Sequence, residues 1–433
     1  MGGAVAAFPT VRPGGRPDGR PDGRPAPRRV WLSRLMVTNF RCYARAEIEA
    51  DGRPVVLAGP NGAGKTNLLE AISYLAPGRG LRRARLSDVD RRTVPAAGPW
   101  AVAATVATPE GPRDLGTGRD PAMGANGNGG GNGGGEGRGA TGRPRERRVV
   151  RIDGAPARSQ RELGEIVAIV WLSPRMDGLF RDSSAARRRF LDRLVYGFDP
   201  AHAGRVAAYE QALRERARLL KTGGAEDTWL AALEDTMARH GIAIAAARRD
   251  LVGRLAQAGG AAKGAGSGPF PVADLALDGK IEAALEGQAA LAVEDRLRAR
   301  LAEARSRDAA AGGAAAGPHR SDLVVSHGER GLPAALCSTG EQKALLISIV
   351  LAHARLLALH RDAAPLLLLD EIAAHLDETR RHALFDEILE LGVQAWMTGT
   401  DAAVFADLGE RARFFQVRAA TLMPVEPPVK NIS

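Results

Sequence analysis

The eight residues 59–66, which read Gly-Pro-Asn-Gly-Ala-Gly-Lys-Thr, constrain the fold of this chain more than any other stretch. They match the phosphate-binding loop pattern, in which two spaced glycines are followed by Lys and then Ser or Thr. Residues 54–58 are typical of a short buried strand, and residues 67–72 begin an apolar-periodic helix. A strand, a glycine turn and a helix N-terminus aim backbone N–H groups at phosphate oxygens. A chance glycine-rich turn is the alternative, and it does not account for the two flanks.

This loop predicts an ATP-binding site with Mg²⁺ as its metal. We expect the Lys65 ammonium to act as a catalytic group on the β- and γ-phosphates, and the Thr66 hydroxyl to hold Mg²⁺. The predicted ATP-binding residues of the loop are Gly59, Pro60, Asn61, Gly62, Ala63, Gly64, Lys65, Thr66 and Asn67.

Residues 364–371 predict a second half of the same site. They read Ala-Pro-Leu-Leu-Leu-Leu-Asp-Glu, which is typical of an interior parallel strand that ends in two acids. Asp370 can hold Mg²⁺ beside Thr66, and Glu371 can act as the general base for the attacking water. An acidic helix N-terminus would explain the two acids without any function. Their pairing with the phosphate loop favours the catalytic interpretation.

Composition favours a cytoplasmic protein with a polyanionic partner. The chain has 433 residues, of which 45% are hydrophobic, so it can bury two cores, and it contains no long apolar run of the kind that spans a membrane. Residues 1–28 lack the apolar core of a secretory signal. Two cysteines, Cys42 and Cys337, cannot make a disulfide framework, which fits a reducing compartment. The net charge of +10, mostly arginine, favours nucleic acid, although a GC-rich genome would also enrich arginine.

We expect an α/β fold with an inserted, mainly helical lobe. The Arg-Pro-Asp-Gly repeats of residues 1–28 and the Gly/Asn-rich residues 108–147 predict a disordered extension and a flexible insertion. Strand-like segments 100–107 and 148–154 flank the insertion, which is therefore expected at the tip of a hairpin. The predicted ATPase domain comprises residues 29–182 and 317–422, with the helical lobe at 183–316 and a tail at 423–433.

Residues 337–343, which read Cys-Ser-Thr-Gly-Glu-Gln-Lys, precede a long apolar helix at 344–359. Ser338 is a plausible N-cap of that helix, and Glu341 stands at the position that completes a capping box. Capping explains the Ser and the Glu without any function. It does not explain the Gly340-Glu341-Gln342 core.

Ser-Thr-Gly-Glu-Gln at 338–342 resembles the signature motif of ABC-type ATPases, which usually reads Ser-Gly-Gly-Gln and also begins a helix. The resemblance implies an ABC-type P-loop ATPase head that works in pairs. Ser338 and Gly340 of one head would contact the γ-phosphate of the ATP held by the other.

Two further segments bear on that resemblance. Residues 374–377 (Ala-His-Leu-Asp) are similar to the superfamily's D-loop, which would place Asp377 near the dimer interface. The superfamily has a His after the next strand, whereas residues 394–401 (Gln-Ala-Trp-Met-Thr-Gly-Thr-Asp) contain none. The γ-phosphate sensor is therefore left without a residue. Asn39 and Arg41 resemble nucleotide-proximal residues of the superfamily's N-terminal segment.

Within the superfamily the chain resembles the RecF family of DNA-repair ATPases over most of residues 30–420. The matching segments are residues 35–43, 76–82, 187–192, 209–213 and 317–323. The 270 or so residues between Lys65 and Ser338 are too few for the coiled-coil arms of SMC or Rad50 proteins. The resemblance implies an ATP-dependent homodimer that binds single-stranded and gapped duplex DNA at single-strand/double-strand junctions. It also implies slow ATP hydrolysis and cooperation with RecO and RecR to load RecA.

Arginines downstream of the phosphate-loop helix are candidate DNA contacts. They are Arg79, Arg82, Arg83 and Arg85, and a solvated arginine face is the alternative. For residues 187–189 (Arg-Arg-Arg), pairing with acids of the helical lobe such as Asp192 is the favoured interpretation. His319 and Arg320 are expected to organise the strand before the signature helix.

Two other functions remain open at this level. A transport ATPase coupled to a membrane permease would have no affinity for DNA. A scaffold in which ATP only stabilises the fold would show no turnover. The acids Asp370 and Glu371 favour hydrolysis, whereas the arginine-rich composition and the missing His disfavour a transporter.

Overall fold

The computed structural model describes residues 28–93, 98–120, 146–223, 226–264, 268–373 and 376–429. One sheet is mixed and has six strands, in the order β15-β14-β3-β13-β12-β8. Its strands are β3 (Val55–Ala58), β8 (Ile169–Leu172), β12 (Leu366–Leu369), β13 (Ala395–Gly399), β14 (Arg413–Arg418) and β15 (Thr421–Val425). All neighbours are parallel except β14 and β15. Every residue of β3, β12 and β13 is buried, as expected for interior parallel strands.

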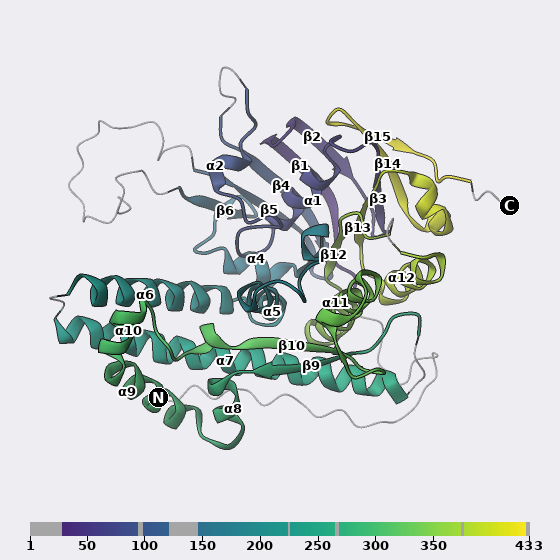
Figure 1. The fold of residues 1–433 in the computed structure, drawn as a ribbon. Helices are drawn as coiled ribbons and strands as arrows, with labels where there is room; N and C mark the ends of the chain where they lie inside the picture. The colour runs from purple at the N-terminus through teal and green to yellow at the C-terminus, as the bar shows by residue number, and fades with distance from the viewer. Residues whose placement is uncertain are drawn as a thin grey trace, which may run out of the picture.

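A second six-stranded sheet is antiparallel, in the order β2-β1-β4-β5-β6-β7. Its strands are β1 (Trp31–Phe40), β2 (Tyr43–Glu49), β4 (Ala101–Thr108), β5 (Gly111–Arg119), β6 (Arg148–Ile152) and β7 (Ala155–Pro156). Helix α1 (Lys65–Ser73) contacts both sheets, touching β1 on one side and β13 on the other (Figure 1). Three aromatic rings pack together where α1 ends, with Phe40 edge-on to both Tyr74 and Trp100. The phosphate-loop helix is thereby fixed between the sheets.

The hairpin expected around the Gly/Asn-rich segment is present, because β5 and β6 pair antiparallel. The predicted start of the flexible insertion is wrong, however. Residues 108–119 complete β4 and form β5, whose register with β4 runs from Thr108–Gly111 to Ala101–Gly118. Backbone pairing with neighbours on both sides outweighs the weak strand propensity of glycine in this segment. Residues 121–145, and the extension at residues 1–27, lie outside the described part of the chain.

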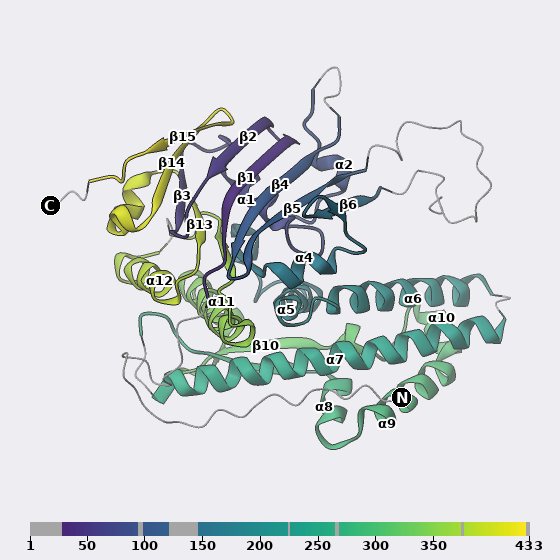
Figure 2. The same cartoon turned by 180° about the vertical axis from the view of Figure 1, so that it is seen from behind.

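Helices form a second body below the sheets (Figures 1 and 2). They are α5 (Ser184–Phe198), α6 (His202–Thr222), α7 (Asp227–Gly264), α8 (Lys280–Gly287), α9 (Ala290–Glu303) and α10 (Arg305–Ala311). Helix α7 has 38 residues and is therefore roughly 57 Å long. The lobe has an apolar core of its own, which includes Tyr209, Met237 and Leu297. Beside that core the buried Arg216 is bonded to Glu234 at 2.9 Å and to Asp308 at 2.8 Å.

One strand inside the lobe was not expected from its sequence. Strand β9 (Ala273–Asp278) pairs antiparallel with β10 (Asp322–His327), which in turn pairs with β11 (Leu332–Pro333). The partner strand β10 follows β9 by more than forty residues, so local patterning does not reveal the pairing. The small sheet ties the lobe to the segment that leads into the signature.

The remaining helices connect these bodies. They are α2 (Leu86–Val89), α4 (Arg161–Ile166), α11 (Thr339–Arg361) and α12 (Glu378–Leu391), with 3₁₀ segments at Pro174–Met176, Pro318–Arg320, Ala334–Leu336 and Ala402–Arg411. Helix α11 is the one helix of the described residues that is long and apolar enough to cross a membrane, and 67% of its most apolar window is buried inside the protein. Its burial between the sheet and α7 identifies it as a core helix.

Candidate functional site

The phosphate loop has the backbone that only glycine accommodates comfortably. Gly62 and Gly64 have φ angles of 79° and 115°, in the left-handed region that disfavours side chains. A Cβ on Gly64 would also lie 2.5 Å from the Tyr43 hydroxyl, so the loop is pressed against the turn between β1 and β2. The loop therefore leads from β3 into α1 with its N–H groups at the helix N-terminus, where phosphate binds favourably.

Lys65 is buried at the base of this loop, with 4% of its surface exposed. Its Nζ donates hydrogen bonds to the carbonyl oxygens of Gly59 at 2.6 Å and Pro60 at 2.9 Å. Burial lowers the pKa of Lys65, and the carboxylates of Glu371 and Asp370 act in the opposite direction. The ammonium is thus held as a buried cation next to the two acids that the sequence predicts as its partners.

A chain of hydroxyls and a carboxylate joins three elements at the same sheet edge. The Thr66 hydroxyl on α1 donates to Asp370 Oδ1 at 2.8 Å. The Thr398 hydroxyl on β13 donates to the same oxygen at 2.9 Å and accepts the Glu371 N–H at 2.9 Å. Strand β13 lies between β3 and β12, so parallel pairing brings these side chains together. Hydroxyl and carboxylate oxygens are the ligands that Mg²⁺ prefers, so Thr66 and Asp370 fit the predicted metal site.

Glu371 has an unusual backbone, with a φ angle of 54°. A non-glycine residue in the left-handed region costs on the order of 1–3 kcal/mol and persists where its surroundings fix it. Here the hydrogen bond to Thr398 fixes the peptide. The carboxylate is partly exposed, which suits a group that must meet water.

Thr398 is a site residue that the sequence analysis missed. It is completely buried, and it stands in the segment where the superfamily's His was sought. Its signal in the sequence is a single polar residue inside the apolar run of β13, since a buried hydroxyl needs hydrogen-bond partners. No sequence feature indicates that those partners are Asp370 and Glu371.

The structure places Arg41 and Arg82 on a buried acid of α1. Glu70 is fully buried, and it accepts two hydrogen bonds from Arg41, at 2.7 and 2.9 Å, and one from Arg82 at 2.9 Å. Arg82 also donates to the Asn67 side chain at 2.7 Å. Both arginines therefore brace the phosphate-loop helix. Glu70, the only acid of this apolar helix, is a second residue that the sequence analysis missed.

The other N-terminal and arginine candidates occupy different surroundings. Asn39 is the next-to-last residue of β1, two residues before Arg41, and has a φ angle of 50°. Arg79, Arg83 and Arg85 are exposed, and none of them forms an ion pair with any described residue. Arg187 pairs with Asp322 at 2.6 Å, whereas Asp192 is bonded to Arg248 at 2.8 Å. The favoured pairing of the arginine run with Asp192 is therefore wrong in its partner, because β10 supplies the nearer acid.

The signature segment forms the N-terminus of α11. Ser338 accepts the Glu341 N–H at 3.3 Å and donates its own N–H to the Glu341 carboxylate at 2.9 Å, which confirms the capping box. Ser338, Thr339 and Gly340 are exposed, and a Cβ built on Gly340 meets nothing within 4 Å. In the described part of the chain, the hydrogen bonds of the Ser338 side chain are all with Glu341. This helix end therefore faces open space.

Asp377 and Asp401 have local structural roles. The Asp377 side chain accepts the Arg380 N–H at 2.9 Å and caps α12. Asp401 caps the 3₁₀ segment that follows β13 by accepting the Ala403 N–H at 2.9 Å. The first part of the D-loop-like motif, residues 374–375, lies outside the described residues.

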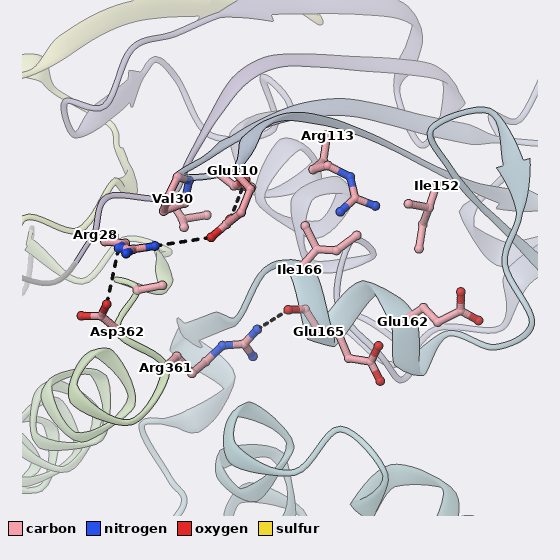
Figure 3. A pocket seen from close by; sticks show the side chains of 13 residues that line it. Arg28, Val30, Glu110, Arg113, Ile152, Glu162, Glu165, Ile166, Arg361 and Asp362 are labelled. Carbon is pink, nitrogen blue, oxygen red and sulfur yellow. Dashed lines mark hydrogen bonds and ion pairs between the residues drawn. The ribbon is translucent and has the colours of Figure 1, made fainter.

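A separate cavity of about 680 Å³ lies between the turn from β4 to β5 and helix α4 (Figure 3), and no residue of the phosphate loop lines it. Arg28 reaches Glu110 and Asp362 across its rim, at 3.5 Å each. Arg361 donates to the Glu165 carbonyl at 2.7 Å. The arginines that line this cavity are paired with nearby hydrogen-bond acceptors, so the cavity shows no preference for a charged ligand.

Comparisons with known proteins agree with this geometry. A family model described as an AAA domain matches residues 34–91. The protein named DNA replication and repair protein RecF from Rhizobium etli is 49% identical over 391 residues, which cover 90% of this chain and 98% of that protein. The protein of the same name from Mesorhizobium japonicum is 49% identical over 400 residues, covering 92% and 99%.

Among solved structures, the recombination mediator protein RecF-ATP in the RecFOR pathway has a TM-score of 0.73 at 20% sequence identity, and covers 93% of this chain and 99% of that chain. A second structure of the same mediator, titled RecF-ATPrS, has a TM-score of 0.74, covering 92% and 99%. These structures support the similarity in fold.

Proposed function

The chain belongs to the RecF family of DNA replication and repair proteins, and from this premise we propose that it is an ATP-driven clamp on DNA. Two copies would close on single-stranded or gapped duplex DNA at a single-strand/double-strand junction when ATP binds. Slow, DNA-stimulated hydrolysis would release the DNA. In the cytoplasm the clamp would act with RecO and RecR to help load RecA. The family argues against the transporter alternative.

The residues of the site have distinct roles in this proposal. The loop from Gly59 to Asn67 and the Lys65 ammonium bind the phosphates of ATP. Thr66 and Asp370 hold Mg²⁺, which when bound neutralises charge that develops on the transferred phosphoryl group. Glu371 accepts a proton from the attacking water. Thr398 fixes the relative positions of Asp370 and Glu371 through its two hydrogen bonds.

One observation supports the proposed dimer. The residues around the phosphate loop are hydrogen-bonded to one another, whereas the N-terminus of α11 is exposed. Thr66, Asp370, Thr398 and Glu371 are joined to one another, whereas Ser338 and Gly340 face open space. The N-terminus of a 23-residue helix attracts phosphate. A second copy of the chain can therefore bring its α11 to the γ-phosphate bound at Lys65. Leu336, which is 70% exposed beside Ser338, would be covered in that contact.

DNA binding is supported by charge. The net charge is +10, and three of the four candidate arginines after α1 are exposed without an acidic partner among the described residues. Contacts of this kind read the backbone and the shape of DNA rather than its sequence. Arg82, which Glu70 holds, would act by keeping this arginine segment in place.

The test is DNA binding to a gapped duplex with and without ATP, with sedimentation of the same samples. The proposal predicts tighter binding with ATP together with a shift from monomer to dimer. Dimers that form with ATP but ignore DNA would overturn the clamp. Uninterrupted duplex of the same length is the control for junction preference.

The scaffold alternative is separated by turnover. Phosphate release measured with saturating gapped DNA should exceed that of the Glu371→Gln variant. Equal rates, both indistinguishable from background, would establish a scaffold in which ATP is bound but not hydrolysed.

A further inference from the structure

A cavity of about 590 Å³ opens between the arginine segment after α1 and helices α5 and α6, and the phosphate-loop function does not use it. Its cationic lining consists of Arg79, Arg82, Arg83, Arg175, Arg189 and Arg193. Its apolar wall includes the aromatic rings of Trp171, Phe190 and Tyr196. The volume lies within the roughly 300–1,000 Å³ that is typical of small-ligand sites.

Arg193 stands out within this cavity because none of the described acids pairs with its charge. Its guanidinium lies 4.7 Å from the ring centre of Trp171 and 5.3 Å from that of Phe190. Its one hydrogen bond to a described residue is to Met176 Sδ, at 3.4 Å. The neighbouring acid, Asp192, is already bonded to Arg248 and His202.

The other buried arginines of the described residues have hydrogen-bond partners. Arg148 donates to the Gly78 carbonyl at 2.9 Å and to Gln160 at 3.1 Å, and two more arginines are neutralised by acids. Arg216 has Glu234 and Asp308, and Arg248 has both oxygens of Asp192. Burial lowers the pKa of Arg193, which is the expected consequence of a cation that lacks such compensation. A guanidinium remains protonated at neutral pH, so an anion that enters the cavity meets a cation that no described acid neutralises.

Hydrogen bonds hold the loop on the rim of the cavity in place. The loop is fixed where Ser73 accepts the Leu81 N–H at 2.7 Å and where Arg148 donates to the Gly78 carbonyl at 2.9 Å. Glu70 holds Arg82. Arg79, Arg83, Arg175 and Arg189 are exposed and make no ion pair with a described residue. The acids on the rim, Asp182 and Glu210, are fewer than the arginines.

We propose that this cavity binds one unpaired nucleotide of single-stranded DNA. The phosphate would lie against Arg189 and Arg193, which are one turn apart on α5, and the base would stack on Tyr196, the partly exposed ring of the aromatic wall. Aromatic faces stack with any base, and arginines neutralise the backbone, so such a site recognises single strands without reading sequence. An acidic peptide would use the arginines and leave the aromatic wall without a role. The inference rests on the proposed DNA-binding function and gives the junction preference a structural origin.

The test compares gapped duplex with uninterrupted duplex, both with ATP, for the full chain and three variants. Arg189→Gln and Arg193→Gln should each weaken binding to gapped DNA by about tenfold, within the range of single contacts to single strands, and leave uninterrupted duplex unchanged. The slope of log affinity against log salt should fall by about 0.7 for each arginine removed. Arg181→Gln is the matched control, since Arg181 is exposed, lies just before α5 and does not line the cavity.

The outcomes separate this inference from the proposed function. Wild-type protein that binds neither DNA would contradict the clamp itself. Wild-type protein that prefers gapped DNA, with both cavity variants retaining that preference, would overturn the cavity inference alone. If Arg193→Gln lowers the melting temperature, the double variant Arg175→Gln/Arg189→Gln decides, because both of its side chains are exposed, both line the cavity, and neither is among the DNA contacts proposed for the clamp.

Fluorescence of Trp171 provides a direct readout, whatever happens with duplex DNA. A 5′-phosphorylated oligothymidylate should quench tryptophan emission, and Trp171→Phe should remove that quenching. Quenching by an oligoglutamate peptide but not by the oligothymidylate would make the cavity an acidic-peptide site and overturn the inference.

Discussion

The two ends of the nucleotide machinery differ in how they are completed. At the carboxyl edge of the parallel sheet, Thr66, Asp370, Thr398 and the Glu371 peptide form one hydrogen-bonded chain. At the N-terminus of α11, the hydrogen bonds of the Ser338 side chain to described residues are all with Glu341 of its own first turn, and Gly340 faces open space. The hydrogen bonds at the sheet edge are thus complete within one chain, whereas the N-terminus of α11 is formed but exposed. Substitutions at the sheet edge should therefore alter the properties of a single chain, and substitutions at the N-terminus of α11 should alter only the dimer.

Lys65→Ala should have the largest effect and should act on the isolated chain. The ammonium provides charge-assisted hydrogen bonds worth roughly 1.5–3 kcal/mol each, so ATP affinity should fall by about 100-fold or more and turnover should disappear. Equilibrium binding of a fluorescent ATP analogue measures the change. Lys221→Ala, at an exposed lysine of α6, is the control. Unaltered affinity would mean that Lys65 keeps its bonds to Gly59 and Pro60 when ATP binds.

Glu371→Gln should separate binding from hydrolysis. General bases contribute about 10²–10⁴-fold to rate, so turnover should fall by that amount while ATP affinity is retained and the dimer accumulates. Single-turnover phosphate release and sedimentation check both effects. Asp386→Asn, at an exposed carboxylate of α12, is the control. Turnover at the wild-type rate would show that Glu371 is not the base.

Ser338→Arg should act only on the pair of chains. The larger side chain would block the open helix end, so ATP should bind with affinity close to wild type while dimers and turnover are lost. Ala289→Arg adds the same charge at an exposed position of the helical lobe and should change neither. Dimers of Ser338→Arg in ATP would contradict the assignment of α11 to the dimer interface.

Thr398→Val tests the hydrogen bonds that hold Asp370 and Glu371 in place at the sheet edge. The substitution keeps the shape and removes the hydroxyl, which leaves the buried Glu371 N–H without its acceptor. Loss of an outer-shell partner typically costs about 10–100-fold, so we expect kcat to fall by about tenfold with KM nearly unchanged. Thr400→Val, at an exposed threonine two residues on, should be neutral. Equal effects of the two variants would remove Thr398 from the site.

The pH dependence of the free energy of unfolding should report on how the buried part of α11 is anchored, and not on its exposed N-terminus. His353 on this helix is buried and bonded to the Leu194 carbonyl at 2.8 Å. Burial, with the nearby Arg193 cation adding to it, lowers the pKa of His353 to about 4 from the ordinary 6.5. Between those two pH values the unfolded chain binds the proton and the folded chain does not, so stability should fall as the pH falls through this window.

The expected loss is roughly 3 kcal/mol at about 1.4 kcal/mol per pH unit. Urea unfolding of wild type and His353→Gln at pH 7.5 and 4.5 measures it, and the variant should lose less stability on acidification. An identical loss in both proteins would show that other groups dominate.

The sequence was a good guide wherever function depends on local geometry. The phosphate loop, the apolar strand that ends at Asp370, the capping box of Ser338 and the RecF-family resemblance were all predictable, and the family is confirmed by the relatives. The loop, the strand and the capping box each lie within about ten consecutive residues, where turn, strand and cap preferences act directly. The family resemblance is the sum of several such short segments.

Prediction failed where the partner is distant along the chain. Strand β5 was assigned to the flexible insertion because its glycines hide a strand that is stabilised by pairing on both sides. Arg187 was assigned to the wrong acid because Asp322 comes from β10, after the whole helical lobe. Glu70 and Thr398 are ordinary residues in sequence, and they become site residues only through Arg41, Arg82, Asp370 and Glu371.

The sequence by itself therefore determined what kind of chemistry this protein performs, because a phosphate loop and a strand ending in acids are encoded by short runs of residues. Only the tertiary structure decided which side chains are satisfied and which remain available. Arg82 and Arg193 line the same cavity, yet Arg82 is bound to a buried carboxylate and Arg193 is not. That difference arises from which elements pack together, and packing is a property of the whole chain.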